Sequence, residues 1–293
     1  MLMKRVFFGR LPGSTVVAFL LAILLARLAA VAAEVAKTMP AGIALQSETR
    51  TNPPQRLLVA QVNLKTSGLR LRVVPGGLDP DGPGKWQTTL MQPTKIAERE
   101  KFDLVINGDF FKAREVSDAE GTNSAYRASL WALAEGPAMT DGKTWSTCSN
   151  SRPCLVVHTN QTVAIESLTQ PDAEDWEVIG GNALLVHNGA IVPHSSKLRH
   201  PRTVVGLDAT GIQMTILVVD GRKPGIALGM TYDELATEMV RLGCTEAINL
   251  DGGGSSLMAV RDPETHKMKI LNDPTDGHER AVVNVLGISV EQN

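Results

Sequence analysis

Short apolar runs that alternate with polar residues recur along the chain from residue 56 onward. They lie at 56–64, 69–74, 104–106, 155–158, 162–165, 183–186, 190–192 and 204–207. Period-two alternation is typical of a strand with one buried face, and a short continuous apolar run is typical of a fully buried strand. Turn residues such as His187-Asn188-Gly189 separate the runs. The pattern predicts many short strands and a few helices, one of them at 94–101.

A second helix is indicated between residues 231 and 243. Thr231 followed by Glu234 three residues later fits a capping box, in which each side chain binds the other residue's backbone amide. Gly243 supplies a stop signal at the far end. Between them, apolar residues recur at helical spacing: Leu235, Ala236, Met239, Val240 and Leu242.

Buried strands at 214–219 and 247–250 flank this helix, and each is followed directly by an acid, Asp220 or Asp251. A strand–helix–strand order predicts a parallel pair with a right-handed crossover. Parallel strands end at the same sheet edge, so we expect the two carboxylates to lie close together there. The predicted fold class is α+β: mixed β-sheets with a few packed helices and at least one βαβ unit, in a single catalytic domain.

The first 33 residues have the pattern of a secretory signal peptide. A basic segment with Lys4, Arg5 and Arg10 precedes an apolar run at 16–26, and small residues follow at 29–33. We therefore expect a secreted or periplasmic protein without stable membrane insertion after cleavage; an uncleaved membrane anchor is the alternative. Residues 34–55 are predicted to be a linker or irregular segment, and residues 56–293 the catalytic domain.

Composition narrows the function classes. The chain has 293 residues with 29 basic and 31 acidic side chains, a net charge of −2 that argues against nucleic-acid binding. Three cysteines lack the spacing of a zinc site. In an exported protein, Cys148 and Cys154 are expected to form a disulfide across a short polar loop. Cys244 is interpreted as a buried apolar thiol.

The segment from Asn249 to Ser256 carries the strongest chemical signal, because a buried strand there meets an acid, three glycines and two hydroxyls. A buried acid is costly unless it is paired or functional. Consecutive glycines let backbone amides approach a ligand closely, typically an anion. A tight turn between two strands is the alternative interpretation.

Similar residues recur elsewhere in the chain. Arg202 and Arg222 have the planar fork that binds phosphate oxygens in pairs, although each could instead form an ion pair with a neighbouring acid. Asp220 and Asp251 are candidates for catalytic carboxylates, metal ligands or caps on loop amides. No Asp-rich loop with calcium spacing is present, so a divalent metal is only an alternative. The full candidate set is Asn107, Asp109, Arg202, Thr203, Asp220, Arg222, Asn249, Asp251, Ser255 and Ser256.

These motifs together resemble the phosphodiester glycosidase family, some of whose bacterial members are exopolysaccharide-associated secreted proteins. The resemblance extends from about residue 56 to 290. It rests on Asn107-Gly108-Asp109-Phe110-Phe111, His200-Pro201-Arg202-Thr203, Val219-Asp220-Gly221-Arg222, Asn249 to Ser256, and Arg280-Ala281-Val282-Val283-Asn284. The family usually carries glycine where this chain has Asp109. That departure weakens Asp109 as an inherited functional residue.

The resemblance implies a hydrolase that cleaves the glycosidic bond of a sugar-1-phosphodiester without a cofactor. A phosphate monoester is a good leaving group, so one carboxylate and a set of anion-binding donors suffice. We expect Asp251 to be that carboxylate, with Asp220 as second choice, and Asn107 and Asn249 to orient sugar or water. Phosphate is assigned to Arg202, Thr203, Arg222, Gly252, Gly253, Gly254, Ser255 and Ser256.

Two other functions compete with this hypothesis. One is a metal-dependent phosphodiesterase that breaks the P–O bond. The other is a non-catalytic envelope protein that binds phosphorylated glycans.

Overall fold

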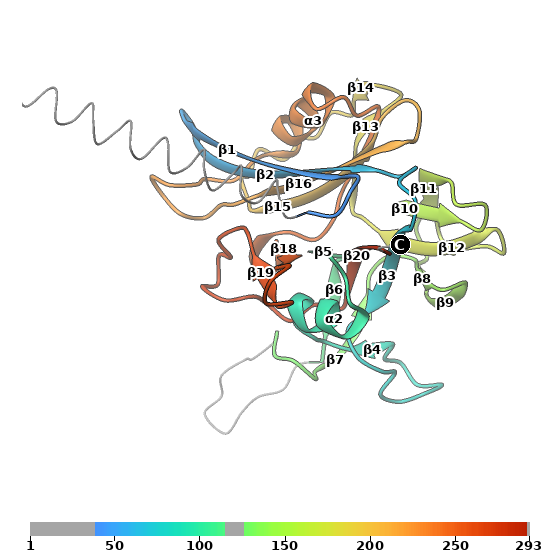
Figure 1. The fold of residues 1–293 in the computed structure, drawn as a ribbon. Helices are drawn as coiled ribbons and strands as arrows, with labels where there is room; N and C mark the ends of the chain where they lie inside the picture. Colours follow the sequence, from blue (N-terminus) through green and yellow to red (C-terminus); the bar gives the residue numbers. More distant parts are fainter. Residues whose placement is uncertain (1–38, 115–125, 292–293) are drawn as a thin grey trace, which may run out of the picture. The chain divides into compact units, whose positions relative to one another are not determined.

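The structure is a computed structural model that describes residues 39–114 and 126–291 (Figure 1). The predicted signal peptide at 1–33 lies outside these residues. Within them the strands form four sheets, and every strand pairing is antiparallel. Two α-helices and one 3₁₀ turn accompany the sheets in the described part of the chain. The fold is therefore β-rich.

A seven-stranded sheet carries the segment that the sequence singles out. Its order is β1 (Ile43–Thr51), β2 (Pro54–Asn63), β16 (Gln213–Val219), β15 (Arg202–Leu207), β17 (Glu246–Asn249), β13 (Ala183–His187) and β14 (Ala190–Ile191). Helix α3 (Tyr232–Arg241) covers one face of this sheet through an apolar cluster that includes Leu235 and Met239. It begins with the predicted capping box of Thr231 and Glu234.

The predicted α+β class and its βαβ unit are wrong. β15 lies between β16 and β17 and is antiparallel to both, so the predicted parallel pair never forms hydrogen bonds. The reason is the tight turn at 208–213, which folds β16 back onto β15 as a hairpin; α3 then returns the chain to the other edge of β15. Since β16 and β17 still run in the same direction, Asp220 and Asp251 follow strands that end at one edge.

Three smaller sheets complete the fold. The first five-stranded sheet has the order β11 (Val163–Leu168), β10 (Arg152–His158), β12 (Asp175–Gly180), β8 (Ala138–Thr140) and β9 (Lys143–Ser146). The second has the order β19 (Met268–Ile270), β18 (Met258–Arg261), β5 (Leu104–Asn107), β20 (Asn284–Val290) and β3 (Leu69–Pro75). The three-stranded sheet is β4 (Thr88–Thr89), β7 (Trp131–Ala134) and β6 (Phe111–Ala113).

Helix α2 (Pro93–Glu100) packs against the second five-stranded sheet through buried Ile96 and Ala97. One large core joins the seven-stranded sheet to both five-stranded sheets, with Ile248, Ile106 and Ile179 as members from each. This packing brings the ends of β5, β15 and β17 together. Residues 43–51, predicted to belong to an irregular segment, instead form the edge strand β1.

Candidate active site

Asp251 lies between the end of β17 and the 3₁₀ turn η1 (Gly253–Ser255), and it is partly buried. Its backbone is held from the neighbouring sheet at two points. The Asp251 amide donates to the carbonyl of Gly108 at 2.9 Å, and the Asn107 side-chain amide donates to the carbonyl of Asp251 at 2.7 Å. The carboxylate therefore projects from a backbone that two sheets fix in place.

Asn107 is fully buried at the end of β5 and serves as the hub of this junction. Its Oδ1 accepts from the Thr203 hydroxyl at 2.7 Å and from the amide of Leu257 at 3.0 Å. With both acceptor positions occupied, Asn107 and Thr203 act on the site through the backbone that they hold.

The pKa of Asp251 is raised to about 6, chiefly because burial disfavours the charged form. The Gly252 amide donates to Oδ1 at 2.7 Å and opposes the shift, as does the positive charge of Arg280. The Ser255 hydroxyl lies close enough to lower the pKa, but makes no hydrogen bond of good geometry. Asp251 is therefore a carboxylate that changes charge within reach of neutral pH.

Two guanidiniums flank the loop Gly252 to Ser256, which we call the glycine loop. A Cβ at Gly253 would lie 3.1 Å from Nη2 of Arg222, and a Cβ at Gly254 would overlap the guanidinium of Arg280. Arg280 is held by an ion pair with Asp276 at 2.8 Å. The glycines thus permit a close approach of two cations to the loop that follows Asp251.

The arginines have polar and aromatic neighbours. Nη2 of Arg222 lies 3.4 Å from Nδ1 of His200, whose pKa is lowered by burial and by nearby arginine charges. The guanidinium of Arg280 stacks on the ring of Tyr126 at 3.9 Å. Sequence reasoning did not assign Arg280 to the site, although the closing Arg280 to Asn284 motif was a signal for it.

The guanidinium of Arg202 contacts Tyr232, whereas those of Arg222 and Arg280 lie against Gly253 and Gly254. Arg202 is 6% exposed, its Nε donates to the carbonyl of Met230 at 3.2 Å, and its guanidinium lies 4.2 Å from the centre of the Tyr232 ring. Asn249 belongs to a polar chain on this side, since its Nδ2 donates to Asn182 at 2.9 Å and Asn182 donates to the Tyr232 hydroxyl at 3.0 Å. These contacts tie the start of β15 and the end of β17 to α3.

Asp220 supports the glycine loop indirectly, through hydrogen bonds to the 272–273 segment. Its Oδ1 accepts from the amide of Asp273 at 3.0 Å and from Nδ2 of Asn272 at 3.3 Å. Asn272 also donates to the carbonyl of Ser256 at 3.0 Å, so one amide connects Asp220 to the glycine loop. Burial raises the pKa of Asp220. Asp220 thus lies at the predicted sheet edge with its carboxylate directed to the 272–273 segment.

Buried side-chain atoms without a hydrogen-bond partner mark the same region. Within the described ranges they lie just after β5, at the end of β17, in the glycine loop and at the start of β20: Asp109 Oδ1, Asn249 Oδ1, Ser255 Oγ, Ser256 Oγ and Asn284 Nδ2. Proteins rarely leave such atoms unpaired, and exceptions are expected where a ligand or water completes the bonding. The hydroxyls and Asn249 belong to the predicted site.

The predicted disulfide is not formed, because Cys148 and Cys154 are both free thiols in the structure. Cys148 Sγ lies 3.0 Å from the carbonyl of Asn150, and Cys154 Sγ lies 3.3 Å from the carbonyl of Arg152. The Cys148 sulfur also lies 3.6 Å from the carbonyl of Thr169, so each sulfur faces backbone carbonyls.

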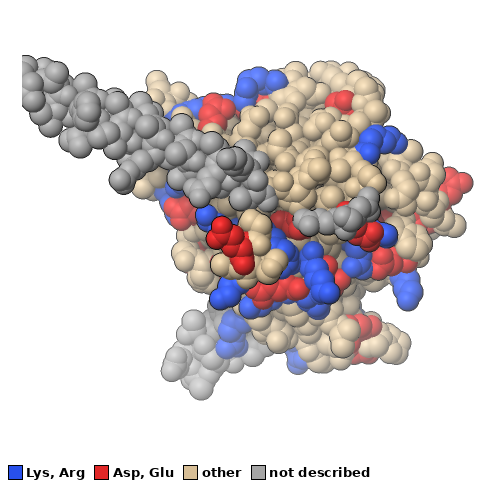
Figure 2. All heavy atoms as spheres, in the orientation of Figure 1, with Lys and Arg blue, Asp and Glu red and all other residues tan. Residues whose placement is uncertain are grey.

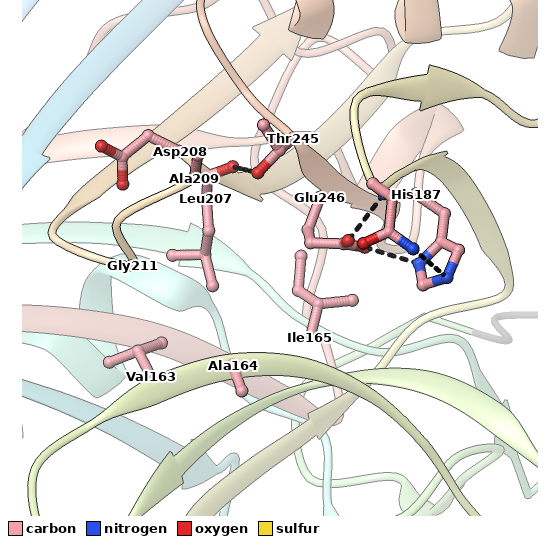
Figure 3. Close-up of a pocket in the computed structure, with 11 residues that line it drawn as sticks. Val163, Ala164, Ile165, His187, Leu207, Asp208, Ala209, Gly211, Thr245 and Glu246 are labelled. Atoms are coloured by element: carbon pink, nitrogen blue, oxygen red, sulfur yellow. Dashed lines mark hydrogen bonds and ion pairs between the residues drawn. The ribbon is translucent and has the colours of Figure 1, made fainter.

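A separate cavity of about 480 Å³ lies at the other end of β15 (Figure 3). It is lined by β11, by Leu207 and Asp208 at the end of β15, and by His187 and Asn188 at the β13–β14 turn. Glu246, the first residue of β17, also lines it and lies 3.0 Å from His187. Because β15 begins beside the glycine loop and extends about 3.4 Å per residue, this cavity lies roughly 17 Å from the loop. It is not part of the candidate site.

Comparison with known proteins then assigns the chain to a family. The family model described as phosphodiester glycosidase matches residues 100–289. The chain belongs to the phosphodiester glycosidase family. The matched region contains both strand-end acids, the glycine loop and the flanking arginines, so the family resemblance inferred from the motifs is confirmed.

This phosphodiester glycosidase family member is also similar to one curated protein over a short region. It is 39% identical over 92 residues to the SPbeta prophage-derived uncharacterized protein YomE of Bacillus subtilis (strain 168). The match covers 31% of this chain and 13% of that protein.

Solved structures share the fold at low sequence identity. The catalytic domain of zebrafish N-acetylglucosamine-1-phosphodiester alpha-N-acetylglucosaminidase, auto-inhibited by its pro-peptide, is 17% identical with a TM-score of 0.60, covering 86% of this chain and 82% of that one. A putative exported protein from Burkholderia pseudomallei K96243 is 15% identical with a TM-score of 0.57, covering 80% and 74%.

Charge distribution and helix length describe the rest of the molecule. Figure 2 shows basic and acidic side chains interspersed on the face drawn. Neither helix within residues 39–114 and 126–291 has the length and apolar character needed to cross a membrane.

Proposed function

We propose that this chain hydrolyses the glycosidic bond of a sugar-1-phosphodiester and releases the sugar and a phosphate monoester. The observation that supports the proposal is the glycine loop itself, which directly follows one titratable carboxylate, Asp251, and lies against two guanidiniums, those of Arg222 and Arg280. A carboxylate acts on the anomeric carbon, either directly or through water, while the cations stabilise the departing phosphate.

The backbone contacts refine the division of roles. The amides of Gly252, Gly253, Ser255 and Ser256 already donate to oxygen atoms of the protein. We therefore assign phosphate binding mainly to the two guanidiniums, with the unpartnered hydroxyls of Ser255 and Ser256 as further donors. Gly253 and Gly254 contribute by admitting the two arginines, and Gly252 by packing against the carbonyl of Pro201. The amide of Gly254 stays a candidate donor to phosphate.

The remaining predicted residues hold the reacting groups in place. Asn107 and Thr203 fix the backbone of Asp251, Asp220 braces the loop through Asn272, and Arg202 anchors β15 to α3. Asn249 keeps one unpartnered oxygen that is suited to a sugar hydroxyl. We expect Asp251, rather than Asp220, to be the reacting carboxylate, since Asp220 already accepts two hydrogen bonds.

We further propose that the substrate is an extracellular or envelope glycan. The signal-peptide pattern at 1–33 supports export, as does the fold similarity to a putative exported protein. A glycosyl phosphodiester or another phosphorylated glycan is the partner that this site suits.

The test is a screen of the exported protein on glycosyl-1-phosphate diesters that differ in the sugar, carried out in oxygen-18 water. We expect the label in the sugar, because the C–O bond breaks; label in the phosphate would indicate a phosphodiesterase. Asp251→Asn should abolish turnover, while Glu98→Gln, an exposed helix carboxylate, should not change it. Binding without turnover across the panel would favour the envelope-binding function instead.

A further inference from the structure

Asp109 lies two residues after the end of β5 and is 1% exposed. Its Oδ2 accepts from the amide of Gly136 at 2.7 Å, and the amide of Phe110 also donates to the carboxyl group. Its Oδ1 has no partner at all. One oxygen of a buried carboxyl group is thus fixed in place while the other is left bare.

The surroundings of Asp109 leave room for a carboxyl group. A Cβ at Gly136 or at Gly180 would lie 2.6 or 2.8 Å from Oδ2, so neither position tolerates a side chain beside this acid. The Asp109 amide is held by Oδ1 of Asn284 at 2.8 Å. The Nδ2 atom of Asn284 is itself buried and unpartnered. Oδ1 of Asp109 and Nδ2 of Asn284 are therefore two buried polar atoms of neighbouring residues that both lack a hydrogen-bond partner.

Asp109 lies next to Asp251, since the residue before it, Gly108, accepts the Asp251 amide. Burial raises the pKa of Asp109 well above its usual value, and the negative charge of Asp251 raises it further. The positive charge of Arg152 opposes the shift, but Arg152 already binds Glu135 at 3.0 Å. The charge of Asp109 in turn helps to raise the pKa of the Cys148 and Cys154 thiols.

We propose that Asp109 is a general acid in this site, and that the chain therefore hydrolyses glycosides with alcohol leaving groups as well as glycosyl phosphodiesters. This inference rests on the proposed function of Asp251. A phosphate monoester leaves without help, but an alcohol leaves only if its oxygen is protonated, which is why ordinary glycosidases carry two carboxyl groups.

The step balances with water as the only co-reactant. The bond between C1 and the glycosidic oxygen breaks, and its electron pair stays on that oxygen, which takes the proton from Oδ1 of Asp109 directly or through one water molecule. Water adds its hydroxyl to C1 and gives its other proton to Asp251. Transfer of that proton back to Asp109 restores both groups.

The experiment compares leaving groups at a constant sugar, the one that the phosphodiester screen selects. Its methyl, phenyl and 4-nitrophenyl glycosides are assayed beside the phosphodiester with the wild type, Asp109→Asn and Asp109→Gly. We expect wild-type turnover of all four. Both variants should lose about 100-fold or more on the methyl glycoside, in line with the usual effect of general acid catalysis. The loss should shrink with leaving-group pKa and be tenfold or less on the phosphodiester.

A pH profile and a control variant exclude a merely structural role. Wild-type hydrolysis of the methyl glycoside should decline at high pH as Asp109 ionises, and this decline should be absent from Asp109→Asn. Glu177→Gln removes another fully buried acid, one outside the site, and should change all four rates by the same factor. A uniform loss in the Asp109 variants would overturn the inference. Wild-type cleavage of the phosphodiester alone would overturn it and leave the proposed function standing, whereas no cleavage of any substrate would overturn both.

Discussion

The side-chain amide of Asn107 donates to the backbone carbonyl of Asp251 across 2.7 Å, which joins the end of β5 to the end of β17. The two strands belong to different sheets and are separated by 144 residues. The same side chain accepts from Thr203 on β15. One buried amide thus sets the position of the proposed catalytic carboxylate relative to three strands.

Replacing Asn107 with Ala should therefore harm both stability and catalysis. The change leaves the Thr203 hydroxyl and the Leu257 amide buried without an acceptor, and we expect a loss of about 2–4 kcal/mol in the free energy of unfolding. Denaturant titration measures that loss. The turnover number should fall about 100-fold at temperatures where the variant is folded, since small displacements of reacting groups are costly. Thr203→Val removes only one donor and should cost about 1 kcal/mol; equal effects of the two variants would contradict the hub role of Asn107.

The pH dependence of activity should report Asp251. A carboxylate with a pKa of about 6 is protonated below that pH and cannot act as nucleophile or base, so turnover on a phosphodiester should rise as pH increases through 6. Because folding raises this pKa, the native state is stabilised relative to the unfolded chain at acidic pH, and that contribution is lost as pH rises toward 6. Asp251→Asn should hence be inactive, yet at least as stable as the wild type in thermal unfolding at pH 8. A less stable variant at pH 8 would contradict the burial argument.

The phosphate assignment is tested at Arg280. Lysine keeps the charge but lacks the planar fork and the stacking on Tyr126, so Arg280→Lys should raise KM for a phosphodiester about tenfold or more and weaken inhibition by inorganic phosphate. Steady-state kinetics measure both. Arg70→Lys alters an exposed ion pair on β3 and should change neither value. An unchanged phosphate inhibition constant in Arg280→Lys would place the phosphate elsewhere.

Local sequence patterns predicted both helices and the strands β5, β15, β16 and β17 around the site, since periodicity, turn residues and the capping box of Thr231 and Glu234 act over a few positions. They gave no strand at β1, β4, β6 to β9, β12 or β18 to β20. They failed on pairing. The helix between β16 and β17 indicated a βαβ unit, but the 208–213 turn pairs β16 with β15, and local patterns do not encode which strand becomes the neighbour. The edge shared by Asp220 and Asp251 was still predicted, because direction is preserved across an intervening antiparallel strand.

Residue types likewise predicted the glycine loop, but not which of the surrounding residues contact it. Arg202 and Arg222 are equivalent in sequence terms, yet the guanidinium of Arg202 is buried against Tyr232 while that of Arg222 flanks Gly253. Arg280 lies 29 positions after Asp251 and joins the site only through packing of the 276–280 segment. The burial of Asp109 and its unpartnered oxygen come from packing of β5 against the neighbouring sheets, which no local motif reveals.

A buried acid outside the site, Glu177, is expected to make the stability of the fold depend on pH. Glu177 on β12 is fully buried and accepts from the amides of Val73 at 2.8 Å and Asp141 at 3.2 Å. Burial raises its pKa to about 8 in spite of these bonds. In the unfolded chain this group ionises near pH 4.5, so folding binds a proton between these two values. The free energy of unfolding should therefore fall as pH rises from about 4.5 to 8, by at most about 5 kcal/mol.

Glu177→Gln removes this proton uptake while keeping an oxygen that can accept. We expect the variant to be less dependent on pH than the wild type in urea titrations at pH 5, 6.5 and 8, with the difference between the two proteins growing toward pH 8 in favour of the variant. Asp109 and Asp251 contribute pH dependence of the same sign, so the difference between variant and wild type, and not the wild-type slope, is the quantity that tests Glu177. Glu98→Gln, on the exposed face of α2, should leave the slope unchanged. Parallel curves for Glu177→Gln and the wild type would show that another group takes up the proton.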